Sequence, residues 1–133
     1  MDYTSSVAYS IRFKNNQQRD KFLLLIEARG DKWELAALKE CVSDKPNCRI
    51  TFQGVGKWYE QYPDVQAHMR LMTLAEESFP EDVEWRFARA GEDNSDTEER
   101  SSERCDYDMY EEATVCVSIQ HDIPDQDEGI PDD

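Results

Sequence analysis

The stretch VEWRFARA at residues 83–90 constrains the fold most, because it is both a strand and a boundary. Val83, Trp85 and Phe87 alternate with Glu84, Arg86 and Ala88. This period of two is typical of a strand that has one face on a core. We therefore expect an inner strand here, at the end of a folded body that is followed by an acidic segment.

Charge is distributed unevenly along the chain. The formal net charge of the 133 residues is -15 at pH 7. Residues 1–90 hold 13 Lys and Arg against 14 Asp and Glu, whereas residues 91–133 hold 16 carboxylates and only Arg100 and Arg104. The C-terminal third thus carries a net charge of -14. Such a segment is typical of a solvating tail or of a surface that meets a basic partner.

Residues 1–90 can be divided into strands and helices by the spacing of apolar residues and by capping signals. Alternation predicts strands at residues 7–14 and 48–53, the second with Cys48, Ile50 and Phe52 facing inward. Three- and four-residue spacing with capping signals predicts helices at residues 15–29, 31–42 and 63–78. Residues 43–47 read as a turn.

The glycines at positions 54 and 56 favour a hairpin loop that leads into a strand at residues 57–61. Trp58 and Tyr59 would then lie on opposite faces of the hairpin. Apolar Val115, Val117 and Ile119 alternate with polar residues and predict a further strand at residues 114–123. We expect that strand to pair antiparallel with residues 83–90.

This order of elements predicts an α+β fold, a ferredoxin-like βαββαβ sandwich with an additional C-terminal antiparallel strand and an acidic loop and tail. We expect one domain over residues 1–123, which includes the acidic loop 91–112, and an acidic C-terminal tail over residues 124–133. A loop of that length is either functional or disordered.

One part of the chain resembles a known family. The run Gly56-Lys57-Trp58-Tyr59, followed by Pro63, a helix and the strand at residues 83–90, is similar to the ferredoxin-like domain named after the plasmid protein YubB. Members of that family belong to plasmids and phages. The resemblance implies an accessory protein of a mobile element and carries over no functional residue.

Motifs for catalysis and metal binding are absent from the sequence. The four cysteines form no C-x-x-C pair and the two histidines, His68 and His121, are far apart, so we expect no metal and no cofactor. Catalytic serine sets, phosphate loops and H-E-x-x-H helices are also missing. The carboxylates lack the spacing of a calcium-binding loop. We therefore expect that the protein is not an enzyme.

No apolar run has the character of a signal peptide or approaches the ~18 residues of a membrane span. We expect a cytoplasmic protein with reduced thiols, in the host cytoplasm if a phage encodes it.

The acidic segment is the predicted site of function. Duplex DNA carries one negative charge per roughly 1.7 Å of axis, so carboxylates along a strand or helix can occupy a nucleic-acid site on a basic protein. Tyrosines within the segment can anchor it by apolar contact. We predict a basic partner, such as a nucleic-acid-handling host enzyme that the protein inhibits or modulates. The predicted partner-binding residues are Trp58, Tyr59, Glu92, Asp93, Asp96, Glu98, Glu99, Glu103, Asp106, Tyr107, Asp108, Tyr110, Glu111 and Glu112.

Two alternatives stay open. A ferredoxin-like sheet can bind nucleic acid through aromatic residues on its open face. Here that face is expected to show few rings, and the net charge repels phosphate, which disfavours direct nucleic-acid binding. The residues expected on this open face of the sheet are Ser10, Arg12, Arg49, Thr51, Glu84 and Arg86. The second alternative is a structural or regulatory domain that the acidic segment only solubilises.

Overall fold

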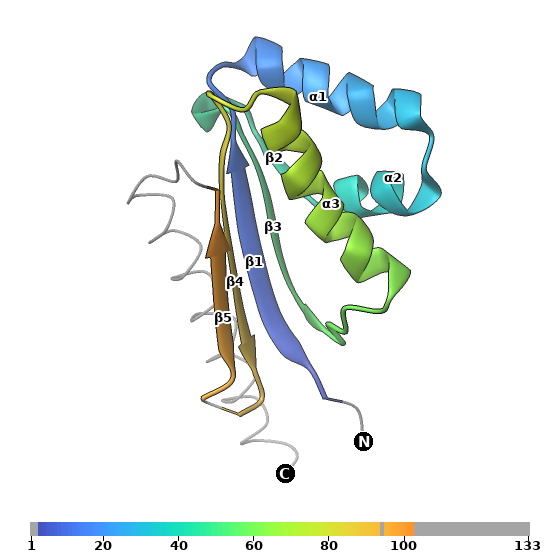
Figure 1. Cartoon of the computed structure of the whole chain (residues 1–133), viewed down its shortest axis with the longest axis vertical. Helices are drawn as coiled ribbons and strands as arrows, with labels where there is room; N and C mark the ends of the chain where they lie inside the picture. The colour runs from blue at the N-terminus through green and yellow to red at the C-terminus, as the bar shows by residue number, and fades with distance from the viewer. Residues whose placement is uncertain (1–2, 94, 103–133) are drawn as a thin grey trace.

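The computed structural model describes residues 3–93 and 95–102. Within them, five strands form one antiparallel sheet in the order β2-β3-β1-β4-β5, and three α-helices cover one face (Figure 1). The strands are β1 (Ser5–Arg12), β2 (Val42–Asp44), β3 (Arg49–Gly56), β4 (Glu84–Gly91) and β5 (Thr97–Ser101). The helices are α1 (Asn16–Arg29), α2 (Lys32–Lys39) and α3 (Pro63–Ser78), and η1 (Lys45–Asn47) is a 3-10 helix. The α+β class is confirmed, and the arrangement is compatible with a ferredoxin-like fold.

The predicted helix boundaries follow from local hydrogen bonding. The side chain of Asn15 accepts a hydrogen bond from Gln18 N at 2.9 Å and caps α1. Gly30 ends that helix with a φ of 65°, which favours glycine. Asp31 Oδ1 then accepts hydrogen bonds from the backbone N–H groups of Trp33 and Glu34 and starts α2. Two consecutive residues therefore separate the helices: Gly30 ends α1 and Asp31 starts α2.

The core lies between the helices and the sheet, with β1 at its centre. β1 pairs with β3 on one side and with β4 on the other. Alternate strand residues point toward the helices, as the period of two predicts. Burial of each large apolar side chain contributes about 1.5–3 kcal/mol. The largest buried apolar residues are Tyr9, Phe22, Phe87, Ile11, Ile26, Ile50, Leu71, Met72 and Val7.

The predicted hairpin after Phe52 is wrong. Gly54 and Gly56 lie inside β3, where they pair with Val7 and Ser5 of β1. Residues 57–62 form a connection to α3 rather than a strand. Both glycines lie within an eight-residue antiparallel ladder with β1, and this pairing outweighs their low strand propensity.

The hairpin that does form joins β2 and β3 through η1. Val42, which we expected at the end of a helix, belongs to β2 and is 65% exposed. Cys48 was predicted to be a core residue, and this is wrong. It has a φ of 55° at the C-terminal cap of η1, and its side chain is half-buried. Ser43 and Asp44, predicted to lie in a turn, therefore belong to β2, and the reversal between the two paired strands occupies residues 45–48.

The acidic loop contains a strand that the sequence did not suggest. β5 pairs antiparallel with β4, with Arg89 opposite Glu98 and Ala88 opposite Glu99. β5 has the sequence TEERS, which lacks apolar alternation. It occupies the side of β4 where we expected residues 114–123. That predicted strand and the tail at residues 124–133 lie outside the described residues.

The sheet face away from the helices is less open than expected. Ser10 and Arg86 are only 3% and 5% exposed, so their predicted exposure is wrong. Arg86 Nη2 donates to Glu99 Oε1 at 2.7 Å, because β5 brings that carboxylate beside β4. Ala8, Ala88 and Ala90 form a small buried cluster on the same face. In the described part of the chain, no helix has the length and apolar character that a membrane span requires.

Candidate functional site

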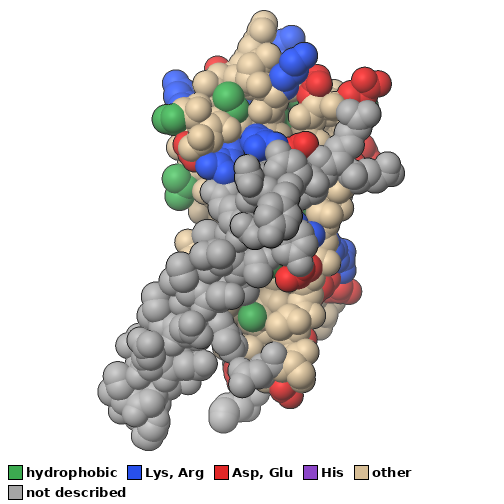
Figure 2. Space-filling model, turned by 90° about the vertical axis from the view of Figure 1, so that its left-hand side faces the viewer, with side chains coloured by type: hydrophobic (Ala, Val, Ile, Leu, Met, Phe, Trp, Pro, Cys, Tyr) green, Lys and Arg blue, Asp and Glu red, His purple; other side chains and the backbone are tan. Residues whose placement is uncertain are grey.

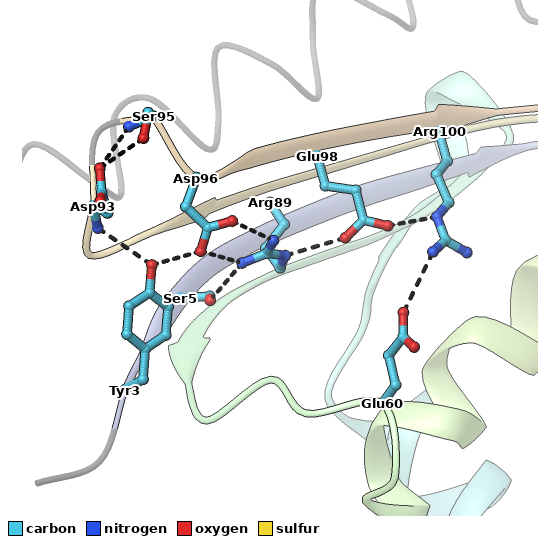
Figure 3. Close-up of polar contacts among 9 residues, drawn as sticks. All are labelled: Tyr3, Ser5, Glu60, Arg89, Asp93, Ser95, Asp96, Glu98 and Arg100. Atoms are coloured by element: carbon cyan, nitrogen blue, oxygen red, sulfur yellow. Dashed lines mark hydrogen bonds and ion pairs between the residues drawn. The ribbon is translucent and has the colours of Figure 1, made fainter.

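An arginine near the end of β4 binds the carboxylates that follow it. Arg89 Nη2 lies 2.8 Å from Asp96 Oδ1, and its Nε donates to Glu98 Oε1 at 3.2 Å (Figure 3). Its Nη1 donates to Ser5 Oγ of β1 at 3.0 Å. Arg89 and Glu98 are directly opposite in the strand register, so their side chains share the helix-facing side. The guanidinium therefore ties β1, β4 and β5 together.

Tyr3 completes this network at the turn between β4 and β5. Its hydroxyl donates to Asp96 Oδ2 at 2.5 Å and accepts a hydrogen bond from Asp93 N at 3.3 Å (Figure 3). A Cβ atom at Gly91 would lie 2.2 Å from the Tyr3 hydroxyl oxygen, so glycine is required for this approach. Hydrogen bonds from Arg89, and then from Tyr3, lower the pKa of the Asp96 carboxyl to about 2.

The remaining carboxylates of this region also have partners within the chain. Glu98 Oε2 accepts a hydrogen bond from Arg100 Nε at 2.6 Å. Glu92 accepts from Thr4 N at 2.7 Å, and Asp93 accepts from Ser95 N at 3.0 Å. Figure 2, which views the side of the molecule that carries β5 in Figure 1, shows basic and acidic side chains interspersed among the described residues. The predicted partner-binding carboxylates at positions 92–99 therefore all accept hydrogen bonds within the chain, and Asp96, Glu98 and Glu99 accept them from arginines.

Trp58 and Tyr59, also predicted to bind the partner, lie in the connection between β3 and α3. The Trp58 ring packs near Phe87, with 6.1 Å between ring centroids. The Tyr59 hydroxyl donates to the Tyr3 carbonyl at 3.1 Å and accepts from Tyr3 N at 3.0 Å. Both residues line one pocket together with Glu98. The other predicted residues, Glu103, Asp106, Tyr107, Asp108, Tyr110, Glu111 and Glu112, lie outside the described residues.

A buried polar chain centred on His68 was not predicted. Tyr9 donates from its hydroxyl to His68 Nδ1 at 2.7 Å, and His68 Nε2 lies 2.8 Å from Glu40 Oε1. Burial lowers the pKa of His68, so the imidazole is neutral and its Nε2–H donates to Glu40. Burial also raises the pKa of the adjacent Cys41 thiol to about 11. This thiol is therefore protonated at neutral pH and is a poor nucleophile.

A second missed cluster joins the three helices. The Glu34 side chain is fully buried and accepts hydrogen bonds from Arg29 at 2.8 and 3.0 Å. Arg70 Nε of α3 donates to the same carboxylate at 2.8 Å. The hydrogen bond from Arg29 is the main cause of the lowered pKa of Glu34. Sequence spacing does not indicate this cluster, because Glu34 and its partner Arg70 are distant along the chain.

Among residues 3–93 and 95–102, no group of three or more His, Cys, Asp or Glu side chains could hold a metal ion. Comparison of the chain with protein families, with curated proteins and with solved structures found no match. The resemblance to the YubB domain and the expected lack of enzyme activity therefore stay predictions.

Proposed function

We propose that the protein is a small acidic interaction module with a ferredoxin-like core, which binds a basic protein partner through its C-terminal third. The observation that carries this proposal is the segregation of charge, since residues 91–133 hold -14 of the net charge of -15. Crowded carboxylates repel one another, and a basic groove on a partner relieves that repulsion. The partner class that fits best is a nucleic-acid-handling protein, whose basic groove normally receives phosphates.

The pairing of the β5 carboxylates supports a narrower contact region within that third. Glu98 and Glu99 are bonded to Arg89 and Arg86, so a partner would have to compete with these contacts. Residues 103–133 hold eleven carboxylates and one cation, Arg104. We therefore place the main contact after Ser102. Its members are Glu103, Asp106, Tyr107, Asp108, Tyr110, Glu111 and Glu112.

The proposed biological setting is a phage or other mobile element, where such a protein would inhibit or modulate a host defence or DNA-handling enzyme in the host cytoplasm. The resemblance to the YubB domain supports this setting. Direct binding of nucleic acid is less well supported, because Arg86 and Arg89 of the sheet already bind carboxylates of this chain.

The test begins with capture of partners from a bacterial host lysate on the full-length protein. The captured partner is then purified, and its affinity is measured against salt concentration and against competing duplex DNA. Binding should weaken steeply as salt rises, and DNA should compete for the same site. The fourfold variant Asp106→Asn, Asp108→Asn, Glu111→Gln and Glu112→Gln should lower the affinity at least about tenfold.

The matched control is the pair Asp132→Asn and Asp133→Asn, which should leave the affinity nearly unchanged. Thermal melting of both variants checks that the fold is retained. An unchanged affinity and salt dependence in the fourfold variant would show that the acidic segment only solubilises the protein.

A further inference from the structure

β5 extends the sheet beyond the helices, and this leaves a pocket on the helix-facing side. The pocket has a volume of about 710 Å³ and lies between α3, the connection at residues 57–62 and strands β4 and β5. Small-molecule sites in proteins commonly measure about 300–1,000 Å³. The pocket therefore has the size of a ligand site.

The lining combines an apolar interior with guanidinium groups from three separate elements. Trp58, Val65, Met69 and Phe87 supply rings and aliphatic surface. The cations are Arg70 of α3, Arg89 of β4 and Arg100 of β5. Glu60 and Glu98 also line the pocket, and the Arg70 guanidinium is bound by Glu34 and Asp31. An apolar interior with a few charged groups is the usual composition of a site that orients a small ligand.

Arg100 is the arginine best placed to receive a ligand. Its side chain is 47% exposed; its Nε donates to Glu98 Oε2 at 2.6 Å, whereas its Nη2 has only the longer contact of 3.5 Å with Glu60 Oε2 (Figure 3). The Glu60 side chain is itself 83% exposed. Exposed ion pairs of this kind contribute little stability, so an anion can replace Glu60 at small cost. Arg89 is less available, because Asp96, Glu98 and Ser5 already occupy its nitrogens.

We propose that this pocket binds a small molecule with a planar aromatic body and one anionic group. The aromatic body packs against Trp58 and Met69, and the anion accepts hydrogen bonds from Arg100 in place of Glu60. Carboxylate, phosphate and sulfonate groups share the required chemistry. The site is built entirely from described residues and does not depend on the acidic segment after Ser102.

The test uses the full-length protein and two dyes that have the same aromatic body. The first, 8-anilinonaphthalene-1-sulfonate, carries one sulfonate, and the second, N-phenyl-1-naphthylamine, carries none. Fluorescence titration should show saturable binding of the anionic dye at one molecule per chain and weaker binding of the neutral dye. Arg100→Gln should lower the affinity for the anionic dye about tenfold, the usual effect of losing a charge-assisted hydrogen bond, and should leave the neutral dye unaffected.

Two further variants separate the pocket from other surfaces. Gln66→Trp places a ring in the pocket from an exposed position on α3 and should abolish binding of both dyes. Lys21→Gln removes an exposed cation of α1 outside the pocket and should change neither affinity. Equal affinity for the two dyes, or an unchanged anionic affinity in Arg100→Gln, would overturn the proposal. Absence of saturable binding would overturn it as well.

The result of the dye titration can be distinguished from the result of the partner-binding experiment. The fourfold variant at positions 106, 108, 111 and 112 should retain dye binding even where it loses the protein partner. Loss of dye binding in Gln66→Trp with retention of the protein partner would place the two functions on different surfaces.

Discussion

Arg89 and Asp96 form a hydrogen-bonded ion pair, 2.8 Å between Nη2 and Oδ1, that spans the turn between β4 and β5. The Arg89 side chain is 16% exposed and that of Asp96 is 36% exposed. β5 contributes few apolar contacts, since its sequence is TEERS. The strand is therefore held by backbone pairing with β4 and by its ion pairs rather than by hydrophobic burial.

Replacement of this arginine should weaken the whole edge of the sheet. Arg89→Met removes the arginine that binds Asp96 and one of the two arginines that bind Glu98, the other being Arg100. Exposed pairs contribute about 0–1 kcal/mol and loss of one partner of a buried pair costs about 3–5 kcal/mol, so we expect a loss of ~1–2 kcal/mol here. The urea unfolding midpoint measures this loss. Lys21→Met is the control for removal of a charge, and equal midpoints for the two variants would contradict the structural role of Arg89.

Asp96 should make the fold sensitive to acid. The pKa of its carboxyl falls from the ordinary 3.8 to about 2 in the folded protein, chiefly because Arg89 binds it. A lowered folded-state pKa gives stability that is present above pH 3.8 and is lost as the pH falls toward 2. In Asp96→Asn the unfolding midpoint should vary less over this interval. The same acid dependence in the variant and the parent would assign the effect to other carboxylates.

His68 should contribute a second pH dependence, closer to neutrality. Burial lowers its folded-state pKa below the ordinary 6.5, so its contribution to stability is present above pH 6.5 and is lost as the pH falls below that value. Protonation also places a proton on Nδ1, which then cannot accept the hydrogen bond from Tyr9. Proton NMR of a His121→Gln variant follows His68 alone. A titration midpoint at or above 6.5 would rule out the buried neutral imidazole.

Phe87 tests which face of β4 meets the core. Its side chain is 1% exposed and packs among the core residues. Phe87→Asp places a charge without a partner in the core, and we expect loss of cooperative thermal melting. Leu24→Asp is the matched control, because Leu24 is 63% exposed on α1 and should tolerate the same change. Melting of Phe87→Asp at the parental temperature would show that the inward face is assigned incorrectly.

The sequence predicted those elements whose signal is local. The alternation around Tyr9 and Phe87 and the helix starts near residues 15 and 31 depend on neighbouring residues, and each was located correctly. The apolar stripe of α3 was located in the same way. Periodicity and capping therefore locate the three helices and the centres of β1, β3 and β4, but not the ends of α2 and β3.

The features that the sequence missed depend on distant partners. β5 exists because Arg86 and Arg89 of β4 face its carboxylates, and alternation of apolar residues cannot reveal such pairing. Gly54 and Gly56 indicate a turn locally, yet β1 holds them in a strand. The same limit applies to the pocket, because Arg70 and Arg100 converge only after the sheet and α3 have packed.

The central position of β1 sets an order of events during synthesis. β1 emerges from the ribosome before both of its neighbours, and its register with β4 is complete only when Gly91 can pair with Ser5. At roughly 5–20 residues per second, translation leaves Val7, Tyr9 and Ile11 unpaired for seconds, while both strand edges are open. The helices can form from local contacts in that interval, whereas the sheet cannot form until residues distant in sequence have been synthesised. β3 can cover one edge of β1 once residue 56 has emerged, but the other edge stays open to aggregation until β4 is released.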